Sequence, residues 1–228
     1  MNALSNYKQR ETPGQVSLTG IHIRIEPIDW ALHGRELFRS ISGPGQDHLW
    51  TYIPVGPFAE YEGFEAVMQY AAQTNNWQTM VICDVNSGAA LGTASYMRLR
   101  ATAGSVEAGC IIFGNALQKT RAATEAMYLM ARHIFDDLGY RRYEWKCDNL
   151  NTASKRAALR YGFQYEGLFR QDLIVKGRNR DTAWFSITDK DWPAVKTAFE
   201  MWLRPENFDL HGQQKSTLES FRSPATAP

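Results

Sequence analysis

A run of small and cationic residues at the start of an expected helix is the stretch best suited to chemistry. It reads Gln118-Lys119-Thr120-Arg121-Ala122-Ala123-Thr124, and apolar residues at helical spacing follow it. The first turn of a helix presents backbone N–H groups that lack intrahelical acceptors, at the positive end of the helix dipole. Such a turn can hold a diphosphate, with Lys119 and Arg121 adding charge nearby. Residue types alone favour a solvated helix face instead.

Glu107 is the carboxylate best placed to act as a base. It lies in the strand-like run Val106–Phe113, where an acid is out of place unless it has a partner or a function. A free glutamate has a pKa of about 4.3, so burial would have to raise that pKa, or a water would have to relay the proton. The sequence leaves a second reading equally open, in which Glu107 begins the strand at its solvated end or pairs with an arginine.

The elements around these residues follow the order strand, turn, helix, strand, turn, helix. Val106–Phe113 is an apolar run ended by Gly114-Asn115, and residues 123–138 carry apolar side chains three or four apart. With the strands expected on either side, this order predicts a mixed sheet with helices on its faces. The other expected strands are 21–25, 79–85, 91–99, 141–147 and a hairpin between 164 and 189, and the other expected helices begin near Asp29, Pro57, Thr152 and Trp192.

Several motifs in this order resemble the GNAT superfamily of acyl-CoA-dependent N-acyltransferases, and within it the Rim-type group that acetylates ribosomal-protein N-termini. The turn at 118–123 is similar to the Q/R-x-x-G-x-G/A turn of that family, with Arg121 in the place of the first glycine. Clear matches cover about residues 91–192. The remaining matches are Asn151-Thr152-Ala153-Ser154 with the N-x-x-S element, Tyr161-Gly162-Phe163 with the G-F element, and residues 166–170 and 180–186 with the final hairpin.

The resemblance implies an α/β GNAT fold, with a mixed central sheet of about seven strands, splayed at its centre and flanked by helices on both faces. It implies acetyl-CoA as co-substrate and direct transfer of the acetyl group to an amine in a ternary complex. The acceptor would be a protein N-terminus or a small-molecule amine. Arg121 would either grip phosphate or point away. The residues implied to hold the CoA pyrophosphate are Gln118, Lys119, Thr120, Arg121, Ala122, Ala123 and Thr124.

The same resemblance implies where the acyl group and the amine would meet. Backbone N–H groups near Ile112 or Phe113 would hydrogen-bond the thioester oxygen, because strands that part leave main-chain groups unpaired. Glu107 lies near the position at which the family uses a glutamate as its base. A base, an oxygen donor and an acid for the departing thiolate are the groups that acyl transfer to an amine requires.

The acid is the part of the pattern that departs most from the family. Many members carry a tyrosine on the last helix, whereas Ala157 and Ala158 occupy that region here. Ser154 matches a serine of the Rim-type enzymes, and its hydroxyl could hydrogen-bond the CoA sulfur and relay a proton. Asn151 would then help to fix the cofactor arm. Helix capping is the alternative reading of both residues.

Two aromatic residues, Trp50 and Tyr52, lie in a loop at residues 42–57 and are candidates for the wall of a substrate slot. Coverage of the core is the favoured alternative for both. A non-catalytic acyl-CoA-binding sensor or scaffold is the second functional hypothesis. The arginine at position 121 and the missing tyrosine are the two features that support it.

Composition sets the remaining expectations. The 228 residues are 44% hydrophobic and 21% charged with a net charge of +1, which does not predict a binder of nucleic acid or anionic membranes. No apolar run approaches the roughly 20 residues of a membrane helix. Three widely spaced cysteines predict reduced thiols in a cytoplasmic protein, and the five histidines form no cluster typical of a metal site.

We expect one acetyltransferase domain over residues 21–204. Residues 1–20 are polar and turn-rich, which favours a flexible N-terminal arm. Residues 205–228 are polar and are expected to form a disordered C-terminal tail. The final hairpin and the C-terminal helix are the segments through which a homodimer could form, and the sequence leaves that question open.

Overall fold

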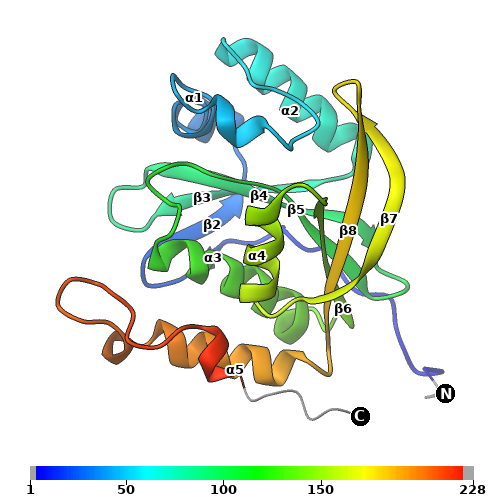
Figure 1. Cartoon of the computed structure of the whole chain (residues 1–228), viewed down its shortest axis with the longest axis vertical. Coiled ribbons are helices and arrows are strands. Elements are labelled where there is room, and N and C mark those ends of the chain that lie inside the picture. The colour runs from blue at the N-terminus through cyan, green and yellow to red at the C-terminus, as the bar shows by residue number, and fades with distance from the viewer. Residues whose placement is uncertain (1–3, 223–228) are drawn as a thin grey trace.

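The computed structural model describes residues 4–222 and contains one mixed sheet of eight strands with five α-helices (Figure 1). The strand order is β1-β2-β3-β4-β5-β6-β8-β7. The strands are β1 (Leu18–Thr19), β2 (Ile23–Pro27), β3 (Gln78–Asp84), β4 (Ala90–Arg100), β5 (Ser105–Phe113), β6 (Arg142–Asp148), β7 (Gln164–Val175) and β8 (Arg178–Thr188). The helices are α1 (Trp30–Ile41), α2 (Tyr61–Asn75), α3 (Arg121–Arg132), α4 (Thr152–Arg160) and α5 (Trp192–Leu203).

The helices cover both faces of the sheet, as the order of elements predicts (Figure 1). Helices α1 and α2 pack on one face, where Leu37 and Phe64 meet Val81 of β3 in a core that also includes Trp50. Helices α3, α4 and α5 pack on the other face, in a larger core. The sheet therefore separates two hydrophobic cores, and its centre lies between them.

Side-chain caps fix where three of the helices begin. The carboxylate of Asp29 accepts hydrogen bonds from two backbone N–H groups at the start of α1, at 2.9 and 3.2 Å. Thr120 and Asn151 cap α3 and α4 through single bonds of 3.1 and 3.0 Å. Helix α2 begins at Tyr61 and not near Pro57, because the backbone is still extended at Glu60.

The central strands β5 and β6 are parallel neighbours that part along their length. They pair over residues 105–108 and 142–145, although β5 continues to Phe113 and β6 to Asp148. The pairing of β4 with β5 shifts register opposite Cys110, whose φ is +46°. Because a bulge bends its strand and increases the twist, β5 turns away from β6 at this point. The predicted splayed centre of the sheet is confirmed.

The last hairpin, β7–β8, is long and has a tight tip. Its turn consists of Lys176 and Gly177, with φ values of +50° and +73°. Two consecutive positive φ values are typical of the turn whose twist matches that of antiparallel strands, and glycine adopts such values without strain. The sheet has one strand more than the predicted seven, because residues 18–19 pair with residues 24–25 of β2.

Both terminal segments make contacts with the domain. In the predicted arm, the backbone N–H of Arg10 bonds to the carbonyl of Ala101, and Leu18 is buried. In the predicted tail, Leu218 is buried against the larger core and Arg222 donates hydrogen bonds to two carbonyls at the end of α4. The flexibility of either segment stays a prediction, and residues 223–228 lie outside the described part. Within residues 4–222, no helix has the length and apolar character needed to span a membrane.

Candidate active site

A pocket of about 680 Å³ opens where β5 and β6 part. Residues of β4, β5, β6 and α4 line it, together with one residue each of β7 and β8. The loop before α2 contributes His48, Leu49, Tyr52, Ile53 and Pro54. Seven of the predicted site residues line this one pocket. They are Tyr52, Glu107, Ile112, Phe113, Gln118, Asn151 and Ser154.

Glu107 is the buried acid of the pocket. Its side chain is 2% exposed and lies 3.5 Å from Arg98 Nε and 3.6 Å from Lys146 Nζ. Burial raises the pKa of Glu107 to about 7, while the charges of Lys146 and Arg98 oppose that rise. A group with this pKa exchanges its proton near neutral pH, as a general base must. Glu107 has the cationic partners that one reading requires and is not at a solvated strand end, and it also faces the pocket, so its role as a base stays a prediction.

The main chain of Phe113 faces the gap between the parted strands. The N–H of the next residue, Gly114, bonds to Leu91 of β4 at 2.9 Å. Because main-chain groups alternate along a strand, those of Phe113 point away from β4. Its carbonyl accepts a bond from Gln118 Nε2 at 2.8 Å, which agrees with that direction. Of the two predicted oxygen donors, Phe113 therefore presents its N–H to the gap, whereas the main-chain groups of Ile112 face β4.

The turn before α3 has free backbone donors. Among the described residues, the N–H groups of residues 119–122 have no hydrogen-bond acceptor, and only that of Ala123 is bound, by Thr120 Oγ1. Lys119 is exposed and has a φ of +59°. Four free N–H groups at the positive end of a helix form a site suited to phosphate oxygens.

Arg121, which stands in place of the family glycine, points away from this turn. Its guanidinium lies over the ring of Phe208 in the C-terminal segment, 3.6 Å from the ring centroid. Such a cation–π contact holds the side chain against the segment after α5. The bulky residue therefore leaves the backbone of the turn open. Thr124 also points elsewhere, since it is buried and its hydroxyl accepts a bond from Arg160 of α4 at 3.0 Å.

Ser154 and Asn151 lie at the first turn of α4. Asn151 Oδ1 accepts the backbone N–H of Ser154 at 3.0 Å, so the capping reading of Asn151 holds while its side chain also lines the pocket. Trp145 Nε1 donates a 3.0 Å bond to Ser154 Oγ. Since the indole can only donate, the hydroxyl keeps its own proton to give to another acceptor. Cys147 is buried beside these residues, and burial raises the pKa of its thiol.

The two aromatic candidates have different places. Trp50 is fully buried in the core under α1 and α2, and its Nε1 donates to the carbonyl of Ile41 at 2.6 Å. It cannot line a slot, because no part of its ring is accessible, so the substrate-binding role suggested for it is wrong. Tyr52 does line the pocket, and its hydroxyl donates to the carbonyl of Leu150 at 3.2 Å.

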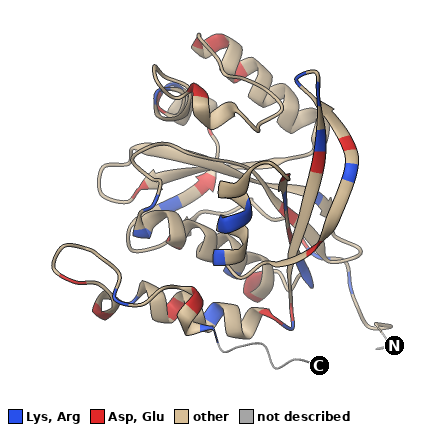
Figure 2. Ribbon diagram, in the orientation of Figure 1, with Lys and Arg blue, Asp and Glu red and all other residues tan. Residues whose placement is uncertain are grey.

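The pocket also contains charged residues that sequence reasoning missed. Arg98 and Lys146 flank Glu107, and Arg180 of β8 lines the pocket although it is 7% exposed. Figure 2 shows basic and acidic residues mixed along the β7–β8 hairpin, and nothing in the sequence separates Arg180 from its neighbours there. Period-two alternation was the available clue, since Arg180 lies on the face of β8 opposite buried Ala183 and Phe185.

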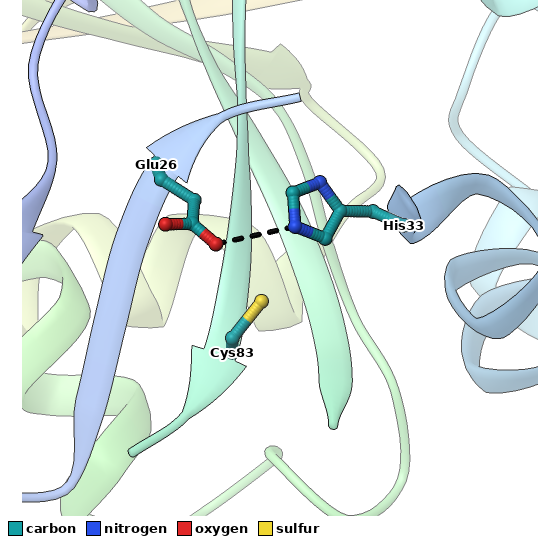
Figure 3. Close-up of side chains that lie close together, drawn as sticks. All are labelled: Glu26, His33 and Cys83. Carbon is teal, nitrogen blue, oxygen red and sulfur yellow. Dashed lines mark ion pairs between the residues drawn. The ribbon is translucent and has the colours of Figure 1, made fainter. Parts of the chain in front are cut away.

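A separate group of side chains, from β2, α1 and β3, has the composition of a metal site (Figure 3). Glu26, His33 and Cys83 place one ligand atom each within 4.8 Å of the others. However, His33 Nδ1 accepts the backbone N–H of Asp29 at 3.1 Å, so the ring proton belongs on Nε2, which lies 3.2 Å from Glu26 Oε1. Burial raises the pKa of Cys83 to about 11. A protonated imidazole nitrogen and a protonated thiol are poor ligands, so these bonds favour a structural pair.

The parted strands, the open turn and the buried acid can be compared with known proteins. The sequence-family model of the acetyltransferase (GNAT) domain matches residues 30–164. The chain belongs to the GNAT acetyltransferases. A GCN5-related N-acetyltransferase from Brucella melitensis is 43% identical, with a TM-score of 0.92, and the match covers 96% of this chain and 99% of that one. The predicted family, fold and enzyme class are confirmed.

Other GNAT structures extend the comparison. A probable acetyltransferase of this family from Chromobacterium violaceum is 37% identical, with a TM-score of 0.79 over 85% of this chain and 96% of that chain. The ribosomal-protein-S5-alanine acetyltransferase from Vibrio fischeri is 20% identical, with a TM-score of 0.61 over 78% and 98% of the two chains, and shares the fold. No curated protein matches the sequence significantly.

Proposed function

We propose that this GNAT acetyltransferase moves the acetyl group of acetyl-CoA to a primary amine by direct transfer in a ternary complex. The observation that supports this most is Glu107, a buried carboxylate with a pKa of about 7 in the pocket where the central strands part. An ionised Glu107 can take the proton that an ammonium must lose before it becomes a nucleophile. Cys147 is a poor candidate for a covalent intermediate, because it is a buried thiol with a raised pKa, and this favours direct transfer.

The residues present fit an acyl-CoA donor. The free N–H groups of residues 119–122 suit the diphosphate, and the exposed side chain of Lys119 adds positive charge beside them. Acetyl-CoA supplies an acyl group that is activated as a thioester. The N–H of Phe113 is directed into the gap, where it would stabilise negative charge on the acyl oxygen. These three features follow one another along residues 113–122.

Two side chains would handle the protons. Glu107 receives the proton of the ammonium, with Lys146 and Arg98 stabilising the carboxylate form that must exist beforehand. The hydroxyl of Ser154, oriented by Trp145, donates to the departing sulfur. Glu107 and Ser154 come from β5 and α4, on opposite sides of the gap, so the acyl group would lie between them.

The alternative of a non-catalytic sensor rested on Arg121 and on the missing tyrosine. The contact of Arg121 with Phe208 leaves the turn open, and Ser154 offers a second proton donor in the pocket. Both observations support the catalytic proposal over the sensor. The acceptor is a primary amine in either of its predicted forms, a protein N-terminus or a small molecule.

The test compares wild-type protein with Glu107→Gln in two assays. CoA release and product mass are measured with a broad amine panel, and thermal stability is measured with and without acetyl-CoA. We expect kcat/KM of the variant to fall about 10²- to 10⁴-fold. The stabilisation by acetyl-CoA, about 2.7 kcal/mol at 100 times its Kd, should be unchanged. Glu62→Gln, on the exposed side of α2, is the matched control and should keep full activity.

The pH dependence gives the second arm of this test. Because only ionised Glu107 can accept a proton, wild-type kcat/KM should fall tenfold for each pH unit below about 7. In Glu107→Gln this fall of kcat/KM at acidic pH should be absent. If the same fall persisted in the variant, Glu107 would not be the base. Binding of acetyl-CoA without turnover of any amine would favour the sensor, and absence of binding would refute both functions.

A further inference from the structure

We propose that Arg180 binds an anionic group of the acceptor, so that the amine substrate carries a carboxylate; this rests on the acetyl transfer proposed above. Arg180 is 7% exposed and lines the pocket. Its hydrogen bond from Nε to Thr182 Oγ1, at 3.3 Å, involves a neutral group of its own strand. Among residues 4–222, no carboxylate lies within ion-pair distance of this guanidinium.

A buried cation without a counter-charge is costly. Removal of a charged group from water carries a penalty of several kcal/mol unless an opposite charge or several hydrogen bonds replace the water. The other cations of the pocket have such a partner, since Arg98 and Lys146 share Glu107. Asp148, the other acid that lines the pocket, accepts the backbone N–H of Leu150 at 2.8 Å. Arg180 is therefore the pocket cation that no carboxylate of residues 4–222 balances, which leaves it available to an anionic ligand.

The position of Arg180 assigns this ligand to the acceptor. It lies near the tip of the β7–β8 hairpin, which is on the opposite side of α4 from the beginning of α3 (Figure 1). The diphosphate site at the start of α3 is thus at the other end of the pocket. Tyr52 and Leu173, from the loop before α2 and from β7, line the pocket together with Arg180. An anion bound there belongs to the molecule that enters from the hairpin side.

The spacing of Arg180 and Glu107 limits the shape of this acceptor. Glu107 pairs with Glu144, and Glu144 pairs with Ser186, which lies on the same face of β8 as Arg180. The six residues of strand from Arg180 to Ser186 span roughly 20 Å. Even with both long side chains reaching toward each other, the amine at Glu107 and the anion at Arg180 must be several bonds apart. An ω-amino acid or a short peptide with an acidic group meets this condition better than glycine.

A carboxylate is the group that best matches this site. A guanidinium presents paired N–H donors that bind both oxygens of a carboxylate, and the contact is stronger where water is excluded. The carboxylate has two possible sources, the free acid of a small amine and an acidic side chain of a peptide. Both would make the same contact with Arg180.

The experiment measures kcat/KM for matched pairs of acceptors. One arm uses ω-amino acids of increasing length against the corresponding carboxamides. The other uses short peptides that differ only by Asp or Asn at the second position. We expect the acid to be preferred about 10- to 100-fold in at least one arm, as for a hydrogen-bonded charge pair. That preference should vanish in Arg180→Gln and persist in Arg178→Gln, an exposed arginine of the same strand. Equal kcat/KM for acid and amide, or a preference that survives in Arg180→Gln, would overturn the proposal.

Two further readouts separate this proposal from its alternatives. Without ligand, Arg180→Gln should melt at the same temperature as wild type or higher, because an uncompensated charge is removed. A fall of several degrees would mean that Arg180 stabilises the fold instead. If the enzyme turned over no amine, the proposed acetyl transfer would be refuted. The anion site at Arg180 would still be tested by measuring ligand binding. The proposal would be supported if 6-aminohexanoate, but not hexylamine, raised the melting temperature of wild type and left that of Arg180→Gln unchanged. Equal shifts with both compounds, or in both proteins, would refute it.

Discussion

The two ends of the pocket present different kinds of functional group, backbone N–H groups at one end and charged side chains at the other. At the end proposed for the donor, the functional groups are the backbone N–H groups of Phe113 and residues 119–122 and the first turn of α4. At the end proposed for the acceptor, they are charged side chains from four different strands. These are Arg98 on β4, Glu107 on β5, Lys146 on β6 and Arg180 on β8.

This difference affects both energetics and adaptability. Backbone donors at a helix start cost little to maintain, because the helix leaves them free in any case. Buried charges, in contrast, lower the stability of the fold unless they are paired. The buried charges of the acceptor end should therefore lower the stability of the fold in a pH-dependent way. At the donor end, affinity for acetyl-CoA should depend on charge near the turn and hardly on which side chain stands at position 121.

The largest effect expected from this comparison concerns the stability of Glu107→Gln. Burial raises the pKa of Glu107 from 4.5 to about 7. A carboxyl whose pKa is raised in the folded state stabilises the fold only while protonated, so this contribution is lost as the pH rises toward and through 7. Relative to wild type, the variant should gain about 3 kcal/mol in free energy of unfolding at pH 8 and less than about 1 kcal/mol at pH 5.

Denaturant unfolding at the two pH values measures this gain. Glu62→Gln is again the control, because Glu62 is exposed and pairs with Arg35 at a distance of 3.5 Å. Its stability should follow that of wild type at both pH values. If the Glu107 variant were less stable than wild type at pH 8, the pairs with Arg98 and Lys146 would outweigh burial, and the acceptor end would be balanced rather than strained.

A smaller effect is expected at the donor end, from Lys119→Asp. Lys119 has a positive φ, which aspartate and asparagine tolerate better than most residues, so both variants should fold. Reversal of the charge beside free N–H groups should weaken acetyl-CoA binding about tenfold, as expected for a partly screened pair near the surface. Lys119→Asn, which only removes the charge, should lose less. Titration calorimetry with acetyl-CoA measures both.

Equal affinity in all three proteins would show that the diphosphate does not lie on this turn. A loss in Lys119→Asn as large as that in Lys119→Asp would show that the lysine side chain makes a specific contact. Either result would remove the contrast between a donor end made of backbone and an acceptor end made of side chains.

The strand end and the helix starts at the end proposed for the donor were predictable from the sequence, because their residues are contiguous. A helix start needs only a cap and a change of periodicity, and Thr120 and Asn151 supply the caps. The apolar run that stops at Gly114 marked the end of the central strand, and Gln118 follows within the same turn. Local patterns such as these depend on residues a few positions apart, which a single sequence displays directly.

The acceptor end could not be predicted in the same way, because it depends on strand order and register. Arg180 reaches the pocket since β8 pairs with β6, and the sequence does not state that pairing. Trp50 was misplaced for a related reason. Its loop reads as exposed, but the ring folds under α1 and α2, where Phe58 and Phe64 pack against it. The local indications of this end were the lone acid Glu107 within an apolar run and the alternation that places Arg180 opposite buried Ala183 and Phe185.

The smallest effect, and the sharpest test of the backbone cradle, is expected from Arg121→Ala. Removal of the guanidinium breaks the contact with Phe208, which should cost about 0.5–1 kcal/mol of stability. Affinity for acetyl-CoA should stay the same, since the N–H groups of residues 119–122 remain. Arg204→Ala, an exposed arginine just after α5, controls for the loss of one surface charge. If Arg121→Ala lost tenfold or more in affinity while Arg204→Ala lost nothing, Arg121 would leave Phe208 to grip phosphate, and the donor end would be a side-chain site like the acceptor end.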